Sequence, residues 1–90
     1  MIVYYGCVKG EARKVLTNGL SKTCYCSFNK NYAFGSARAA TLEEGSSQEM
    51  VIMTIKTDAD NLSIASFQYG NMEVLVNNPK NAQIIKIEVA

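Results

Sequence analysis

The chain has 90 residues, of which 48% are hydrophobic and 19% are charged, and this composition excludes an intrinsically disordered segment. Because a chain of this length buries enough surface for one hydrophobic core, we expect residues 1–90 to form a single domain. The net charge of +1 supplies no broad positive field, which argues against a protein that coats nucleic acid.

The first strand is predicted at residues 2–5, where β-branched and aromatic residues lead up to Gly6. This segment has no basic region and only a short apolar run, so we expect neither a signal peptide nor a membrane anchor. The three cysteines are an odd number, which favours reduced thiols and a cytoplasmic location over a disulfide framework. Since the sequence contains no histidine, no metal site is expected.

A helix is predicted over residues 11–18, opened by Gly10. Its apolar residues recur at helical spacing, at Ala12, Val15 and Leu16. We expect this helix to stop at Gly19, which tolerates a positive φ, with Leu20 folding back onto the last turn.

The second strand is predicted at residues 24–28, and a second helix follows it. Asn29 or Asn31 is expected to cap that helix by accepting a hydrogen bond from a first-turn amide. The helix is expected to include residues 32–42, and its alanines offer a thin face that fits close against a sheet.

The second half of the chain has the pattern of a series of strands. A polar loop is expected at residues 43–48, and the apolar run at residues 50–55 predicts a central strand that is covered on both faces. Residues 62–67 read as a weak strand or an irregular segment, and residues 73–76 and 84–89 as two clear strands. In the last strand Lys86 and Glu88 are expected to point outward.

This order of elements predicts an α+β fold, with two helices packed on a small, mainly antiparallel sheet of five or six strands. A doubly wound nucleotide-binding fold is disfavoured. The glycines at positions 6 and 10 lack the phosphate-binding spacing of that fold.

Several short motifs, taken in order, resemble the ADP-ribosyltransferase fold. They are Tyr4-Tyr5-Gly6, the helix end at residues 15–20, residues 25–29 leading to Tyr32-Ala33, and the late strands with Glu73 at a strand start. The resemblance covers most of the chain, and it is to small mono-ADP-ribosyltransferases such as phage-borne or toxin-like members. It implies that NAD is a substrate and that ADP-ribose is transferred to a macromolecule, most simply a protein.

The resemblance also implies a catalytic pair. Enzymes of this family split the bond between nicotinamide and ribose through a cation-like transition state, which a carboxylate near the ribose stabilises. Glu73 matches that carboxylate, and Ser27 matches the strand-borne serine that supports it. Asn71, two residues before Glu73, matches the position that selects the acceptor.

The NAD-binding positions are implied in the same way. Gly6 would offer its backbone to the nicotinamide amide, and Tyr32 or Phe34 would stack on the nicotinamide ring. Tyr5 stands where the family normally has arginine or histidine. A tyrosine hydroxyl can donate a hydrogen bond to a ribose, but it lacks the bidentate grip of arginine on a phosphate.

Three other interpretations stay open at this point. Glu73 has a purely structural interpretation, as a charge at the exposed start of an edge strand that discourages unwanted pairing. The whole chain could be a non-catalytic protein of the same fold that inhibits a partner protein by direct binding, as phage anti-defence proteins and antitoxins do. A thiol-dependent activity at Cys7, Cys24 or Cys26 is disfavoured, because no histidine is present to activate a thiolate.

Overall fold

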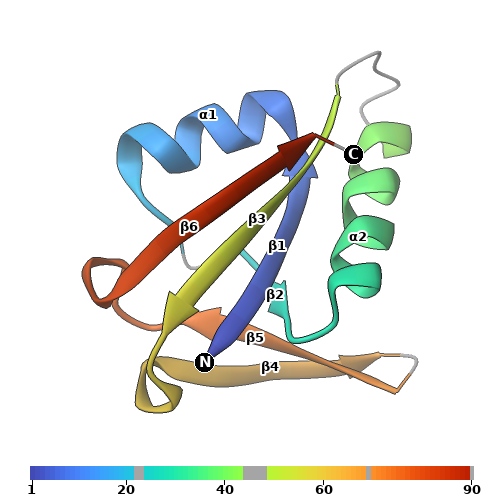
Figure 1. Cartoon of the computed structure of the whole chain (residues 1–90). Helices are drawn as coiled ribbons and strands as arrows, with labels where there is room; N and C mark the ends of the chain where they lie inside the picture. The colour runs from blue at the N-terminus through green and yellow to red at the C-terminus, as the bar shows by residue number, and fades with distance from the viewer. Residues whose placement is uncertain (22–23, 44–48, 69, 90) are drawn as a thin grey trace.

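In the part of the chain that the structure describes, six strands form one sheet and two helices lie against it (Figure 1). The computed structural model describes residues 1–21, 24–43, 49–68 and 70–89. The strands are Ile2–Val8 (β1), Cys26–Ser27 (β2), Met50–Thr57 (β3), Leu62–Gln68 (β4), Asn71–Val76 (β5) and Ala82–Val89 (β6). The helices are Lys9–Asn18 (α1) and Lys30–Glu43 (α2), and short 3-10 helices at Ala59–Asn61 and Pro79–Asn81 precede β4 and β6. The expected α+β class is confirmed.

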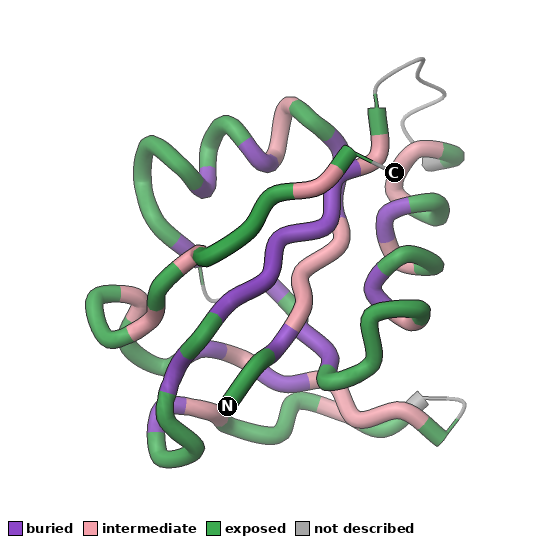
Figure 2. Tube along the Cα trace, viewed as in Figure 1, coloured by how far each residue is buried: buried purple, intermediate pink, exposed green. Residues whose placement is uncertain are grey.

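The strands lie in the order β4-β5-β2-β1-β3-β6, and every neighbouring pair is antiparallel. The strands change direction strongly from β6 to β4, as twisted sheets do (Figure 1). The prediction that residues 50–55 form a strand covered on both faces is confirmed, since β3 is buried from Val51 to Ile55 (Figure 2). That strand lies next to the β6 edge rather than in the middle of the sheet.

The two helices pack on opposite faces of the sheet. On one face, here called the α1 face, Ala12 and Val15 of α1 join the odd-numbered residues of β1, and on the other, the α2 face, Ala33 and Ala37 of α2 pack against Ile52. Side chains alternate between the faces along each strand, which explains why β1 and β3 contribute to both clusters.

Gly6 is the point at which α2 touches the sheet. A β-carbon built on Gly6 would lie 1.8 Å from the carbonyl oxygen of Ala33, so only glycine permits this approach. The prediction that the first strand stops at Gly6 is therefore wrong. β1 continues to Val8, because Gly6 serves helix packing and not a turn.

The predicted helix ends are largely confirmed. Gly19 has a φ of 83° and its amide donates to the carbonyl of Val15 at 2.8 Å, while Leu20 is buried in the core on the α1 face. Asn29 rather than Asn31 caps α2, since its Oδ1 accepts from the amides of Asn31 at 2.9 Å and Tyr32 at 3.4 Å. The strand predicted at residues 24–28 pairs only at Cys26–Ser27.

The strands of the second half are longer than predicted, since β4 and β6 are seven and eight residues long. Of the polar loop expected at residues 43–48, residues 44–48 lie outside the described part of the chain. In β6 the expected alternation holds from Lys86 to Val89, but the register with β3 shifts at Ile85, so Ile84 rather than Ile85 pairs with Ile55. Ile85, Ile87 and Val89 are 48%, 44% and 63% exposed, because α1 packs mainly on β1 and β3.

Candidate functional site

Glu73 and Ser27 lie directly opposite each other on the neighbouring strands β5 and β2. Directly opposite residues of an antiparallel pair share a face, so both side chains belong to the α2 face. Ser27 in turn pairs with Tyr4 of β1, and Glu73 pairs with Ser66 of β4. The register therefore gathers four polar side chains, from β4, β5, β2 and β1, into one row across the sheet.

Hydrogen bonds hold the side chains of both Glu73 and Ser27. Ser66 Oγ donates to Glu73 Oε1 at 2.6 Å, which orients the half-buried carboxylate on β5. The amide of Asn29 donates to Ser27 Oγ at 3.0 Å, and Asn29 Nδ2 donates to Asn71 Oδ1 at 3.1 Å. Asn29 thus joins β2, the N-terminus of α2 and the start of β5, since it also caps that helix.

The structural interpretation of Glu73 as the exposed start of an edge strand is wrong. β5 lies between β4 and β2, and Glu73 is the third residue of the strand, with partners on both sides. At this inner position the carboxylate does not protect a sheet edge against unwanted pairing, so edge protection does not explain the charge of Glu73.

Tyr5 is not brought together with Glu73. It lies on the α1 face, packed against the core that contains Cys7 and Cys24. Burial, together with these thiols, raises the pKa of Tyr5 far above its ordinary value, so the hydroxyl stays protonated. The neighbouring Tyr4 is the β1 tyrosine that shares the face of Ser27 and Glu73.

The other predicted NAD-binding residues lie in or under α2. Gly6 is covered by the backbone of Ala33, so the α2-facing side of its α-carbon is closed. Tyr32 is half-buried in the first turn of α2 beside Asn29, and Phe34 is 39% exposed next to the packed Ala33. Tyr32 therefore lies at the same end of α2 as the Asn29–Asn71 contact, because that contact adjoins the first turn.

The three cysteines are unpaired and buried. Burial raises the pKa of both Cys7 and Cys26 to about 12, and the nearby Glu11 adds to the effect at Cys7. Thiols held protonated in this way are poor nucleophiles. The environment of Cys7 and Cys26 is thus the opposite of an activated thiol site.

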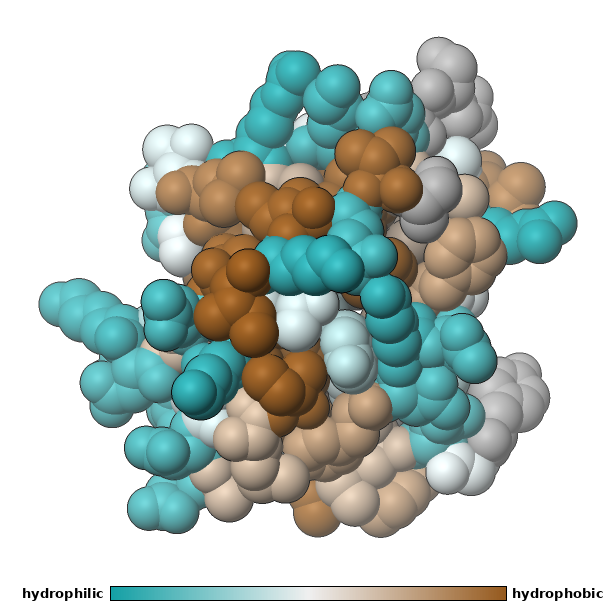
Figure 3. Space-filling view, in the orientation of Figure 1, coloured by the Kyte–Doolittle hydropathy of each residue, from teal (hydrophilic) through white to brown (hydrophobic). Residues whose placement is uncertain are grey.

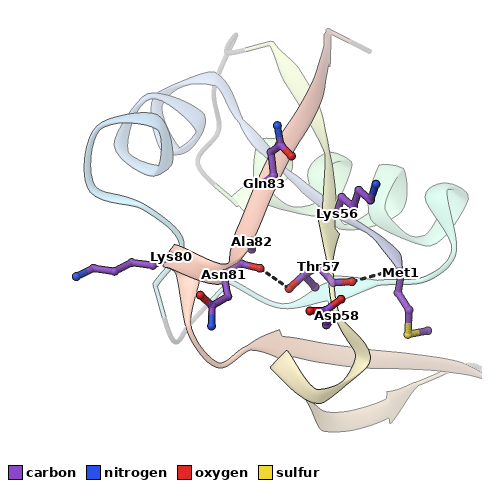
Figure 4. A pocket seen from close by; sticks show the side chains of 8 residues that line it. All are labelled: Met1, Lys56, Thr57, Asp58, Lys80, Asn81, Ala82 and Gln83. Atoms are coloured by element: carbon purple, nitrogen blue, oxygen red, sulfur yellow. Dashed lines mark hydrogen bonds between the residues drawn. The ribbon is translucent and has the colours of Figure 1, made fainter.

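A cavity of about 360 Å³ lies elsewhere, where the end of β3 meets the start of β6 (Figure 4). Its rim includes Lys56, Asp58 and Lys80, and Thr57 Oγ1 donates to the carbonyl of Asn81 at 2.9 Å beneath it. The two lysines extend away in opposite directions, so they do not converge on one ligand (Figure 4). None of the site residues predicted from the sequence lines this cavity.

Comparisons with known proteins add no relative: no family model matches the sequence, and no curated protein or solved structure matches it significantly. Neither helix is long and apolar enough to cross a membrane, as judged over the residues that the structure describes. Within the same residues no group of three or more cysteine, aspartate or glutamate side chains could hold a metal ion.

Sequence reasoning missed three polar residues of this site. Tyr4 and Ser66 join it through strand register, and Asn29 joins it through its side-chain bond to Asn71. For Asn29 a signal was present, because an asparagine before a helix already indicated a cap. For the other two no local signal exists, since register is a long-range property.

Proposed function

We propose that the protein is a small ADP-ribosyltransferase that binds NAD over the polar row of the α2 face, with Glu73 as its catalytic carboxylate. In the reaction, the bond between the ribose and nicotinamide breaks with its electron pair passing to nicotinamide. A nucleophile on a macromolecular target then bonds to the ribose carbon and gives up its proton to solvent. Glu73 holds a ribose hydroxyl and offsets the positive charge that develops on the sugar.

The observation that carries the proposal is the register that sets Ser27 against Glu73. The resemblance to ADP-ribosyltransferases requires a serine on one strand to support a glutamate on another, although 46 positions separate them in this chain. The pairing of β2 with β5 brings the two residues to neighbouring positions without any adjustment. Ser66, which donates to the carboxylate at 2.6 Å, would hold it in one orientation.

The proposal assigns the remaining residues by their place around that carboxylate. Asn71 lies on the same strand and face as Glu73, two residues away, so it would meet the acceptor group. Tyr4 replaces Tyr5 as the β1 side chain of the site, because Tyr5 lies on the other face. Tyr32 would bound the nicotinamide end, since it begins the helix that Asn29 caps.

The test is incubation of the purified protein with NAD labelled in the adenylate moiety and a cell lysate, followed by separation of labelled macromolecules. The wild type should transfer label, and Glu73→Gln should reduce the rate by at least about a hundredfold, because a neutral amide does not offset the developing charge. Ser27→Ala should give an intermediate loss. NAD binding to each variant is measured in parallel by the NMR shifts of the protein.

The matched control is Glu49→Gln, which removes an exposed carboxylate near the N-terminal end of β3 and should leave the labelling rate unchanged. If neither wild type nor Glu73→Gln labels any macromolecule and NAD shifts no resonance, the proposed activity is wrong. The non-catalytic inhibitor of a partner protein is then the remaining interpretation. A rate that Glu49→Gln lowers as much as Glu73→Gln would also refute the assignment of the carboxylate.

A further inference from the structure

β6 is an edge strand with an open side. It pairs with β3 on one side only, and none of the strands in the described part of the chain pairs with the other side. Its eight residues contain no proline or glycine, and Ile85, Ile87 and Val89 are exposed. Hydrophobic atoms gather along the diagonal course of β6, crossed by a hydrophilic side chain (Figure 3). A long, apolar edge of this kind is a template for another strand.

The pattern of charges along β6 indicates which strand fits against its open side. Lys86 and Glu88 lie on the α2 face on either side of Ile87, whose side chain is on the α1 face. If a second β6 runs antiparallel about a two-fold axis through Ile87, each Lys86 lies opposite Glu88 of the other copy. Ile87 then meets its own symmetry mate, and Val89 lies beside Ile85, the residue at which the register of β6 with β3 shifts. Every directly opposed pair is therefore either oppositely charged or apolar.

Other registers of the same two strands are worse. A shift of two residues places Lys86 opposite Lys86 or Glu88 opposite Glu88, and like charges directly opposite each other destabilise a sheet. A shift of one residue merges the α2 face of one copy with the α1 face of the other, which sets charged side chains against isoleucines. The sequence of β6 is thus complementary to itself in one antiparallel register.

Within each copy, the carboxylate of Glu88 lies close to the ammonium groups of Lys30 and Lys86. Glu88 Oε1 lies 2.6 Å from Lys30 Nζ and 3.8 Å from Lys86 Nζ, and the hydrogen bond from Lys30 lowers the pKa of this carboxyl. The carboxylate therefore stays ionised at neutral pH beside the open edge. Lys86 is 63% exposed and has room to reach a partner strand.

We propose that two copies of this chain form a dimer by pairing their β6 strands antiparallel about Ile87, so that two six-stranded sheets become one continuous sheet. An isologous contact of this kind closes on itself and leaves no further open β6 edge. The partner is a second copy of this chain, and the pairing is independent of the proposed NAD chemistry, because β6 and β5 are separated by three strands.

Sedimentation velocity at concentrations from about 1 to about 200 μM tests this proposal, a range that covers the usual affinities of small interfaces. The wild type should shift from the monomer mass toward twice that mass as its concentration rises, and the outward-facing amides of β6 should gain hydrogen-exchange protection in step. Lys86→Glu alone should raise the dissociation constant at least tenfold, because the carboxylate introduced by this substitution would lie opposite Glu88 of the other copy. Glu88→Lys alone should have the same effect, through two opposed ammonium groups.

The decisive measurement mixes these two variants. In a heterodimer of Lys86→Glu and Glu88→Lys, both opposed pairs are oppositely charged. One pair consists of the two introduced side chains, and the other consists of the native Lys86 and Glu88. The mixture should therefore recover the dimer that neither variant forms alone. Phe67→Lys, which adds a positive charge on the other edge strand, β4, is the matched control and should dimerise as the wild type does. Circular dichroism confirms that each variant is folded.

A wild type that stays monomeric at the highest concentration overturns the proposal, and so does a dimer that Lys86→Glu leaves intact. If the mixture of the two variants fails to dimerise, the β6–β6 register is wrong. Disruption by Phe67→Lys would move the interface to the β4 edge and would equally overturn it.

Discussion

One methyl group added at Gly6 should dislodge α2 from the sheet. The new β-carbon of Gly6→Ala would lie 1.8 Å from the carbonyl oxygen and 2.7 Å from the carbonyl carbon of Ala33, and 3.2 Å from the amide nitrogen of Ala37. All three are backbone atoms, so no side-chain rotation relieves the clash and the helix must move outward. That movement opens the cluster of Ala33, Ala37 and Ile52. We expect a loss of about 3 kcal/mol, the upper end for overpacking.

The assay is thermal and urea unfolding followed by circular dichroism. For a domain of this size the loss corresponds to a fall of roughly 12–24 °C in Tm. Gly35→Ala is the matched control, because among the described residues a β-carbon there meets no atom within 4 Å beyond the nearby backbone of its own helix, and alanine favours the helix interior. It should gain about 0.5–1 kcal/mol. A Gly6→Ala variant within about 0.5 kcal/mol of wild type would show that α2 does not seat on Gly6.

Two further variants probe the core and the loops. Burial raises the pKa of Cys7 and Cys26 in the folded protein to about 12, against an ordinary value of 9.0. Their contribution to the free energy of unfolding is therefore complete below pH 9.0 and is lost as the pH rises toward 12. The loss is at most about 1.4 kcal/mol per pH unit for each thiol. Urea midpoints between about pH 8 and about pH 11 measure this, and Cys7→Ala should weaken the dependence; equal slopes would contradict the burial argument. The side chain of Asn61 makes three hydrogen bonds. Its Nδ2 donates to Thr57 Oγ1 and to the backbone carbonyl of Asn78, both at 2.9 Å, and its Oδ1 accepts from the backbone amide of Asn78 at 2.8 Å. Asn61→Ala should therefore cost about 2–3 kcal/mol in urea unfolding, and a cost below about 0.5 kcal/mol would mean that water replaces these bonds.

Local patterns in the sequence were enough for most elements of this fold. Gly19 follows the last turn of α1 with positive φ, and Asn29 caps α2, because both positions depend on chemistry within a few residues. The buried run of β3 was equally clear, since a strand covered on both faces has no polar alternation. These features need no knowledge of what lies across the sheet.

The parts that could not be predicted depend on contacts between distant segments. Nothing local distinguishes Gly6 as a helix-packing site from Gly6 as a turn, because its meaning comes from Ala33. Likewise Tyr4 and Tyr5 are identical residues in a strand buried on both faces. Only the pairing of Tyr4 with Ser27 decides which of them shares a face with Glu73. Consecutive residues of a strand face opposite sides of the sheet. Tyr5, which the resemblance selects, is therefore one position away from Tyr4, the tyrosine that shares the face of Ser27 and Glu73.

The two helices leave different parts of the sheet uncovered, and this explains why both proposed sites lie where they do. α2 rests mainly on β1 and β3, with its start near β2, and Glu73 of β5 is half-buried. α1 rests on β1 and β3 of the other face and does not cover β6, so Ile87 stays exposed. A core centred on β1 and β3 supplies the stability of this small domain. The two proposals therefore concern strands on either side of that core: the carboxylate of Glu73 toward one edge and the self-complementary β6 at the other.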